Sequence, residues 1–557
     1  MKWILFLTLV FFSSVICAQQ TVGSLLNTED SYQGYTIISP SSYKASYLIN
    51  NCGEVINSWE SDFFVALMAE IDLEGNLFRT MRLQTEGGFV GGGIGGGLEK
   101  FSWDGELLWT GDFADEMHHS HHDLSIMPNG NVLLIQWDKI LAEDVFANGR
   151  SPMTFGDDSL WPDKIIEVEI LDNNEYNIVW EWRAWDHIVQ DYDSSLPSYG
   201  EIHEHPEKIN LNLLPTEGGN DLSDWMHTNG VDYNEELDLI VISLRHFSEI
   251  MVIDHSTTTE EAAGSTGGNF GMGGDLLYRY GNPANYNLGT VDDQMFFGQH
   301  DSRWHYNDEI EQWQISVFNN GVNRPGGGAS TAEIITLPLE GNTFLREENL
   351  AFGPEEIYFS FPSIPDTNLF ASRVCGAQIL PNNNVLYAAG AGGTIWEVTQ
   401  ESEDLVYDYQ MPVGIAGPLE YNTPNFNTNY FKVTRYSEDY PGFEGKDMTP
   451  GDYIELNNPG SDCIIYENQS NDTTSVFERF EGQRNLLIYP NPASSTCQID
   501  IPGQGVLNIY NALGKLHDSI VLNYAQVLQL DISFFTKGMY YVNFSGQESS
   551  NTKLIIK

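Results

Sequence analysis

Short apolar runs, each ended by a turn signal, follow one another from about residue 30 to residue 435. Helical periodicity is nearly absent from this region. Runs of this length between clusters of Gly, Asn, Asp and Pro are typical of β-strands. The pattern therefore predicts an all-β fold.

A four-strand unit recurs in this region, and its fourth strand is the most recognisable because it is rich in aromatic residues. The copies of this fourth strand read EVINSW, ELLWTG, NIVWEW, DLLYRY, EIYFSF and LVYDYQ. The second strands recur as NLFRTM, NVLLIQ, LDLIVI, WQISVF and NVLYAA, each shortly after a turn. The six aromatic strands predict a six-bladed β-propeller.

The two ends of the repeat region complement each other. YLINN and EVINSW lie near the N-terminus, whereas YFKVTRY lies near residue 433. A blade built from both ends closes the ring and removes the exposed edges of an all-β sheet. Two long insertions, 184–223 and 255–274, interrupt the repeat, and long loops on a rigid scaffold are often functional.

The chain divides into three parts by composition. The first 18 residues, MKWILFLTLVFFSSVICA, have the basic start, apolar run and small final residue of a secretory signal, with cleavage expected after Ala18. After about residue 480, the runs LLIYPNPASSTCQIDI, GVLNIYNALGK and GMYYVNF mark a small separate β-domain. We expect a signal peptide at 1–18, a propeller at 19–480 and a β-sandwich at 485–557. No later apolar run is long enough to span a bilayer.

Charge and motif content exclude several functions. Lys and Arg total 25 against 79 Asp and Glu, a net charge of -54 that repels nucleic acid. The absence of a GxxxxGK[ST] loop excludes the usual nucleotide-dependent transferase design, and neither GxSxG nor HExxH is present. Four cysteines follow the signal, namely Cys52, Cys375, Cys463 and Cys497, which is compatible with one disulfide but forms no disulfide framework.

Three histidines occupy one register in successive repeats. Each stands seven residues before an asparagine, in the pairs His122 and Asn129, His227 and Asn234, and His300 and Asn307. This register opens the first strand of a blade, and first strands line the central channel of a propeller. The matching position holds Cys375, just after Arg373, in the next repeat and Leu67 in the first.

Histidines at one channel mouth beside Arg245 suit an oxyanion such as a sulfate or phosphate ester, because Arg forms paired charge-assisted bonds. The alternatives are structural histidines that satisfy buried backbone groups, and a zinc site of three imidazoles. A second metal candidate combines His203, Glu204 and His205, extended with both imidazoles on one side, with His187. We expect no metal, and the run GGFVGGGIGGG predicts a hairpin loop because no helix start follows it.

The segments HHDLSIMPNGNVLLI, DWMHTNGVDYN, LIVISLRHFSEIMVIDH, FGQHDSRWH and SRVCGAQILPNNNVLY resemble the bacterial arylsulfotransferase family, over most of residues 35–450. Members are six-bladed propellers that move a sulfuryl group between phenols without a nucleotide. The resemblance implies that His300 is the transiently sulfurylated nucleophile and that His227 and Arg245 hold the sulfuryl oxygens. It matches His122 to a position at the mouth of an earlier blade and Asn229 to the family's HxN pattern. We expect His122 to be catalytic together with His300, His227 and Arg245. We expect Asn229, His121 and Arg373 to bind substrate.

The tail resembles the C-terminal sorting domain of the type IX secretion route of Bacteroidetes bacteria, which implies a secreted or surface protein that meets this machinery. Together these observations predict an exported aryl-sulfate sulfotransferase that acts on aryl sulfates and phenols without a cofactor. The competing hypothesis is a non-catalytic secreted propeller that binds a polysaccharide or a surface partner. A quinone-dependent dehydrogenase is not supported, because no repeated Trp motif with calcium carboxylates is evident.

Overall fold

The computed structural model describes residues 20–466 except 42, 85–87, 154, 216–222, 364–368, 424–427 and 461–464, and in the tail 488–489, 496–501, 505–511, 516–522, 526–532, 535, 538–546 and 549–556. The expected signal peptide, Cys463 and much of the YPNP and Gly-Lys motifs lie outside these residues. Contacts divide the chain into two compact units, one of 1–401 with 406–468 and one of 402–405 with 469–557.

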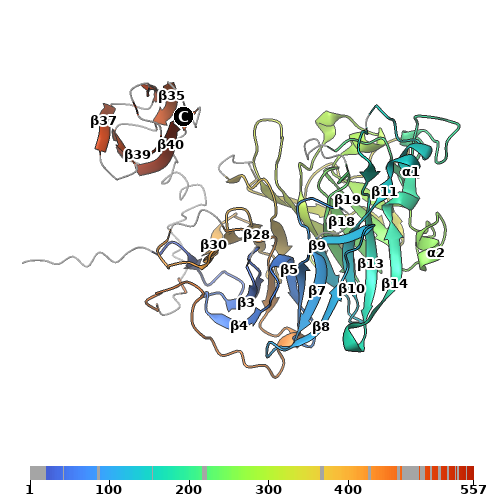
Figure 1. The fold of residues 1–557 in the computed structure, drawn as a ribbon, viewed down its shortest axis with the longest axis horizontal. Coiled ribbons are helices and arrows are strands. Elements are labelled where there is room, and N and C mark those ends of the chain that lie inside the picture. Colours follow the sequence, from blue (N-terminus) through green and yellow to red (C-terminus); the bar gives the residue numbers. More distant parts are fainter. Residues whose placement is uncertain are drawn as a thin grey trace, which may run out of the picture. The chain divides into compact units, whose positions relative to one another are not determined.

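Six sheets of four or five antiparallel strands form the first unit (Figure 1). Each sheet is given from its inner strand outward. The first contains β33 (Thr434–Ser437), β2 (Gly34–Ile38), β3 (Ala45–Asn50) and β4 (Val55–Glu60), and the second contains β5 (Val65–Ile71), β6 (Leu77–Arg82), β7 (Gly96–Phe101) and β8 (Leu107–Asp112). The third contains β9 (His118–Ile126), β10 (Val132–Asp138), β13 (Asp163–Ile170) and β14 (Tyr176–Arg183).

The other three sheets follow in chain order. They contain β17 (Thr228–Asn234), β18 (Leu239–Leu244), β19 (Glu249–Asp254) and β20 (Tyr278–Tyr280); β21 (His300–Asn307), β22 (Gln312–Asn319), β23 (Thr331–Thr336) and β26 (Phe359–Phe361); and β27 (Gly376–Ile379), β28 (Val385–Ala389), β29 (Thr394–Val398), β30 (Leu405–Gln410) and β1 (Gly23–Asn27). The all-β class and the six-bladed propeller are therefore confirmed.

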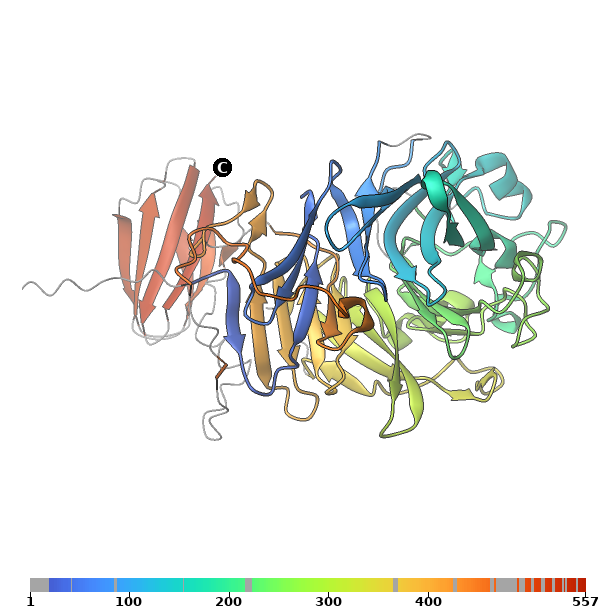
Figure 2. The same cartoon turned by 90° about the horizontal axis from the view of Figure 1, so that it is seen from below.

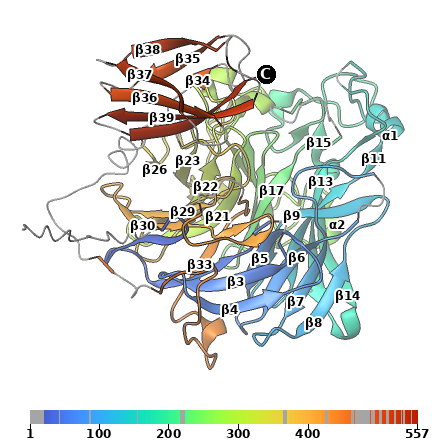
Figure 3. The same ribbon diagram turned by 60° about the vertical axis from the view of Figure 1, so that its left-hand side comes forward.

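The repeat read from the sequence matches the strand order in every blade. The aromatic strands are β4, β8, β14, β20, β26 and β30, each fourth in its sheet, and the predicted second strands are β6, β10, β18, β22 and β28. The first strands contact one another in succession, β5 with β9, β9 with β17, β17 with β21 and β21 with β27. Figure 3 shows β5, β9, β17 and β21 around the middle of the ring, with β4, β8 and β14 at its rim.

Both ends of the repeat region close the ring. As predicted, strands from both ends of the repeat region share one blade, but β33 pairs with β2, which lies between β33 and the YLINN strand β3. A second closure was not foreseen, because β1 pairs with β30 and adds a fifth strand to the last blade. Figure 2 shows these N-terminal strands, in blue, beside the orange strands from the end of the propeller. Both termini of the propeller are thereby held in its first and last blades.

The hydrophobic core lies between adjacent blades. One buried cluster joins Leu239 and Ile250 of one blade to Ile315 and Ile335 of the next. Both faces of these sheets are therefore covered, which explains why β18 reads as the continuous buried run LIVISL rather than as an alternating pattern.

Short elements decorate the blades. The helices are α1 (Ala142–Ala147) and α2 (Thr259–Ala262), and the 3-10 turns are η1 (Asp172–Asn174), η2 (Ala184–His187), η3 (Ile202–Glu204), η4 (Pro283–Tyr286), η5 (Val291–Asp293) and η7 (Pro441–Phe443). The two-residue strands pair as β11 (Ile140–Leu141) with β12 (Ser159–Leu160), β15 (Ile188–Val189) with β16 (Ile209–Asn210), β24 (Leu339–Glu340) with β25 (Thr343–Phe344), and β31 (Val413–Gly414) with β32 (Gly417–Pro418). Among the described residues, no helix has the length and apolarity needed to cross a membrane.

The second unit contains two antiparallel sheets. One joins β34 (Ile488–Tyr489), β35 (Thr496–Ile501) and β38 (Gln526–Asp531), and the other joins β37 (Leu516–Leu522), β36 (Gly505–Asn511), β39 (Gly538–Gly546) and β40 (Ser549–Ile556). Residues from both sheets, such as Ile499 and Phe544, share one buried cluster. This is the packing expected of a small sandwich.

Candidate functional site

The three in-register histidines lie where the first strands are bulged. His122 lies inside β9, His227 directly precedes β17 and His300 begins β21. The ladder to the second strand slips at these places in all three blades. His122 and His227 also have left-handed backbone angles, with φ of 55° and 52°. A bulge re-aims a side chain, and the left-handed conformation costs about 1–2 kcal/mol, so the fold holds these rings in place against a local preference.

The rings form one buried cluster. His122 and His227 meet edge to face with centroids 4.6 Å apart, and Phe431 lies 6.3 Å from His122 and 6.1 Å from His300. Burial, together with the charges of Arg245 and neighbouring histidines, holds the pKa of His122 and of His300 well below the ordinary range. Burial and Arg245 lower the pKa of His227 to about 3. All three imidazoles are therefore neutral at neutral pH.

Asn320 fixes the tautomer of His300. Its amide nitrogen donates to the carbonyls of Ala371 and Val374, at 2.7 and 3.2 Å, which orients its oxygen toward the ring. That oxygen lies 2.7 Å from Nδ1 of His300 and can only accept. Nδ1 therefore carries the hydrogen, and the lone pair of the neutral ring is on Nε2, the nitrogen available for nucleophilic attack.

A relay through His121 fixes His122 in the same tautomer. Nε2 of His121 donates to Asp163 at 3.1 Å, so Nδ1 of His121 accepts from Nδ1 of His122 at 2.8 Å. His121, expected to bind substrate, is instead bonded at both nitrogens and supports His122 from behind. The structure also resolves which of the two adjacent histidines meets His227, because the close ring contact is made by His122.

Asp224 and His246 surround His227 and were not singled out from the sequence. Nδ1 of His227 lies 2.5 Å from a carboxylate oxygen of Asp224, whose other oxygen accepts from the Trp137 indole at 3.0 Å. His246 stacks on His227 at 4.5 Å and lies 2.7 Å from the Asp224 carbonyl. The available signals were a carboxylate three residues before His227 and a histidine directly after Arg245.

Asp224, His227 and His246 also form the one group of potential metal ligands found in the part of the chain that the structure describes. Nδ1 of His227 and one oxygen of Asp224 are already joined by a close hydrogen bond, and Arg245 adds a positive charge nearby. Burial lowers the pKa of His246 to about 4, so its ring is neutral at neutral pH. The three in-register histidines do not form such a group.

The candidate HEH metal site does not have the extended geometry that it would need. Residues Ile202–Glu204 form the 3-10 turn η3, so His203 and His205 are not on one extended strand. His205 instead pairs with Glu207 at 2.9 Å. His187 is buried, and its Nδ1 lies 2.8 Å from a carboxylate oxygen of Asp275.

The glycine-rich loop before β7 lies against the histidines. A Cβ added to Gly93 would meet the His122 ring at 2.3 Å, and one on Gly92 would lie 3.4 Å from Nε2 of His227. A Cβ on Gly91 would touch Trp137 at 2.8 Å. The loop was predicted as a hairpin connection with no chemical role, but only glycine permits its backbone to approach these rings so closely. It forms a wall of the site.

Arg245 and Asn229, which the resemblance to the arylsulfotransferases singled out, lie near the three histidines. Arg245 follows β18 and donates to the carbonyl of Ser372 at 3.2 Å, next to Arg373, whose own side chain is exposed. Asn229 is buried and donates to the carbonyl of Gln299 at 2.8 Å, one residue before His300. The contact ties the strand after His227 to the strand of His300, so the position of Asn229 suits alignment of the two blades.

An ion network lies directly beneath the histidines. Nζ of Lys432 bonds Asp123 at 2.8 Å and Asp301 at 3.0 Å, and these aspartates follow His122 and His300 in the chain. Arg303 also pairs with Asp301, at 2.9 Å. Burial alone would lower the pKa of Lys432, but the two carboxylates raise it above its ordinary value. Lys432 therefore ties two histidine-bearing strands together.

The structure describes the state of three of the four cysteines that follow the expected signal peptide. Cys52 is disulfide-bonded, whereas Cys375 and Cys497 are free and buried. Cys375, at the register position of the histidines, accepts a weak bond from Asn320 at 3.6 Å. Burial raises the pKa of its thiol to about 12, so it is a neutral packing residue beside His300.

Comparisons with known proteins bear on the family and the tail. The chain resembles the solved structure of a protein of unknown function from Bacteroides caccae, at 11% identity and a TM-score of 0.37, over 73% of this chain and 100% of that one. It also resembles AztD from Citrobacter koseri, at 8% identity and a TM-score of 0.33, over 73% and 99%. No curated protein matches the chain.

Two family profiles match the sequence. Residues 487–557 match the secretion system C-terminal sorting domain, which indicates a protein that is secreted or displayed on the cell surface by the type IX route. Residues 36–334, more than half of the chain, match the arylsulfotransferase family. With its six-bladed propeller, the chain belongs to the arylsulfotransferase family.

Proposed function

We propose that the protein moves a sulfuryl group from an aryl sulfate ester to a phenolic acceptor, through a covalent intermediate on Nε2 of His300 and without a nucleotide. The observation that carries this proposal is the contact between His300 and Asn320, which leaves Nε2 with its lone pair at neutral pH. A neutral imidazole is a competent nucleophile there.

In the donor half-reaction, the Nε2 lone pair of His300 forms a bond to sulfur while the bond between sulfur and the aryl oxygen breaks. The electron pair of the broken bond leaves on the phenolate. Arg245 lies close enough to His300 to depress its pKa, and its charge would stabilise the sulfuryl oxygens as they pass between the two groups.

In the acceptor half-reaction, a phenol oxygen attacks the sulfur and the bond to His300 breaks, returning the electron pair to Nε2. The phenol proton needs a base. His122 and His227 both present an unprotonated Nε2 because their Nδ1 atoms are held by His121 and Asp224. Either can take this proton and hold it until the next donor half-reaction, where it passes to the departing phenolate, so the overall reaction is balanced.

The test is turnover of 4-nitrophenyl sulfate with phenol as acceptor. His300→Asn should abolish turnover, because it removes the nucleophile common to both half-reactions. His305→Asn is the matched control, since His305 lies on the same strand five residues later and only partly buried. Full activity of His300→Asn would contradict the proposal. Absence of any turnover in the unaltered protein would favour the binding-protein hypothesis.

A further inference from the structure

A cavity of about 680 Å³ lies away from the histidines. We call the propeller end that carries the histidines the histidine face, and the end that carries the turns between first and second strands the turn face. The cavity is lined by Asn307, the last residue of β21, whereas His300 is the first. Seven residue steps of an antiparallel strand span about 24 Å, so the turn-face cavity is separate from the proposed active site.

The walls of the turn-face cavity are polar. They come from two neighbouring blades and include Asp30, Glu309, Tyr358, Asn383, Gln400 and Glu401. Carboxylates and amides dominate, two aromatic residues form one side, and no lysine or arginine is among the described lining residues. The volume falls within the usual range of about 300–1,000 Å³ for ligand sites.

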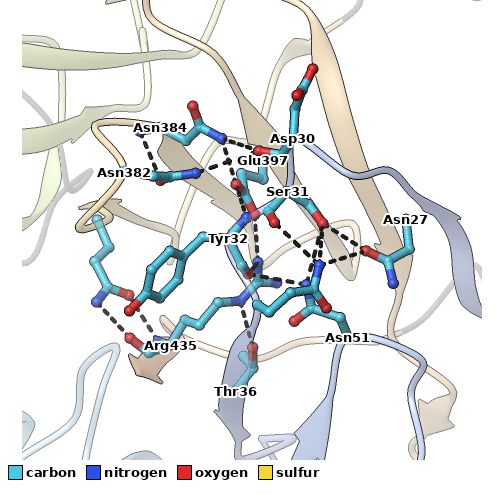
Figure 4. Close-up of polar contacts among 12 residues, drawn as sticks. Asn27, Asp30, Ser31, Tyr32, Thr36, Asn51, Asn382, Asn384, Glu397 and Arg435 are labelled. Atoms are coloured by element: carbon cyan, nitrogen blue, oxygen red, sulfur yellow. Dashed lines mark hydrogen bonds and ion pairs between the residues drawn. The ribbon is translucent and has the colours of Figure 1, made fainter. Parts of the chain in front are cut away.

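A buried network holds part of this wall in place (Figure 4). Asn384 donates to Glu397 at 2.6 Å and to the carbonyl of Asp30 at 2.9 Å, and Glu397 forms an ion pair with Arg435 in which both side chains are fully buried. Asn382 accepts from the Asn384 backbone at 3.1 Å. The wall is therefore ordered before any ligand arrives, which reduces the entropy lost on binding.

The lining restricts the class of ligand. Asp30, Glu309 and Glu401 repel anions, in a chain whose net charge is -54. These carboxylates do not converge as metal ligands among the described residues, so a divalent cation is not indicated. An apolar ligand would leave the amides without partners. The lining amides outnumber the carboxylates and offer both donors and acceptors, which matches a neutral molecule rich in hydroxyl groups.

We propose that the turn-face cavity binds a neutral oligosaccharide. Tyr358 is 45% exposed and presents a ring on which a sugar can stack. Asn383 and Gln400 offer both donors and acceptors, and the carboxylates accept from sugar hydroxyls. This inference goes beyond the sulfotransferase activity and does not depend on it, because it concerns other residues at the other end of the propeller.

The test is affinity electrophoresis in native gels that contain laminarin, xyloglucan, galactomannan, arabinoxylan or starch, with polygalacturonate as the anionic comparison. The full chain should be retarded by at least one neutral polysaccharide and not by polygalacturonate. Tyr358→Ala and the double variant Asn383→Ala, Gln400→Ala should each weaken this binding by about tenfold. Tyr192→Ala is the matched control, because Tyr192 is a 52% exposed tyrosine in the first insertion.

Retardation by none of the neutral polysaccharides would overturn the proposal, and so would equal retardation of the control and the cavity variants. Retardation by polygalacturonate alone would show an anion site instead. The cavity variants should turn over 4-nitrophenyl sulfate at the rate of the unaltered protein, and His300→Asn should keep its glycan binding. Failure of either site is therefore distinguishable from failure of the other.

Discussion

Replacing Lys432 by methionine should both destabilise the propeller and slow sulfuryl transfer. The side chain of Lys432 is 3% exposed, and its ammonium bonds two carboxylates that are fully buried, Asp123 and Asp301. Methionine fills a similar volume but removes the charge. Asp301 keeps its ion pair with Arg303, whereas Asp123 keeps backbone hydrogen bonds from Leu124 at 2.9 Å and from Val231 at 3.0 Å.

The cost should fall on Asp123. Removing one partner of a buried ion pair typically costs about 3–5 kcal/mol, because the remaining charge is left without compensation. Burial already raises the pKa of Asp123 in spite of Lys432, so the variant should hold this carboxyl protonated to higher pH. At roughly 1–2 °C per kcal/mol for a propeller of this size, the melting temperature should fall by about 5 °C.

Turnover should fall as well, because Asp123 and Asp301 directly follow His122 and His300 and a shift of these strands moves the rings. A displacement of a fraction of an ångström should lower kcat by about tenfold while KM changes little. Calorimetry at one scan rate measures the first effect, and initial rates with 4-nitrophenyl sulfate and phenol measure the second.

Two variants make the result interpretable. Lys164→Met removes a partly exposed ion pair with Glu181 and should cost less than about 1 kcal/mol. The double variant Lys432→Met, Asp123→Asn removes both charges and should regain most of the stability but not the activity. If Lys432→Met melts and turns over like the unaltered protein, the ion network of Lys432, Asp123 and Asp301 does not position the histidines and this reasoning is refuted.

Further predictions concern the glycine-rich loop beside the histidines, the protonation of the histidines, the tautomer of His300 and the C-terminal tail. Gly92→Ala should lower kcat/KM by about tenfold, because its methyl group would lie against Nε2 of His227 without backbone strain; Gly156→Ala, in open space, should have no effect in the same assay. Turnover should stay within about twofold from pH 8 to pH 5, because the pKa of His300 is lowered well below 6.5; a loss centred near pH 6.5 would contradict this. Stability should fall with pH below 6.5, where the unfolded chain binds protons that these buried imidazoles refuse, as a chemical denaturation series would measure. Asn320→Ala should slow release of nitrophenol in the donor half-reaction by about tenfold, since Nδ1 of His300 loses its acceptor; an unchanged burst would count against tautomer control. Protein recovered from culture medium should lack residues 485–557, and an intact mass that includes them would exclude removal of the tail.

The sequence predicted the parts of the fold that depend on local periodicity. The aromatic fourth strands and the blade built from both ends of the repeat region follow from strand patterns that repeat along the chain, although the pairing of β33 with β2 itself was not predicted. The pairing of β1 with β30 was not predicted, because GSLLN is a short run whose partner lies nearly 400 residues away. Its place is set by the unfilled edge of the last blade.

The candidate site was predicted only in its outline. Register alone brought His122, His227 and His300 to one end of the channel, but their tautomers depend on Asn320, Asp163 and Asp224, which come from other strands and loops. The contact of the glycine-rich loop with His122 is likewise made across two blades. Hydrogen-bond partners distant in sequence leave no periodic trace, and this part of the chemistry needed the structure.

The central claim is that His300 carries the sulfuryl group between donor and acceptor. The most direct test is to mix the protein with 4-nitrophenyl sulfate alone, quench it, and measure peptide masses after digestion. We predict a sulfuryl mass increment on the peptide that contains His300, its loss when phenol is added before quenching, and parallel lines when donor and acceptor are varied in initial-rate plots. An unmodified His300 peptide together with intersecting lines would contradict the account, because the group would then pass directly from donor to acceptor or through another residue.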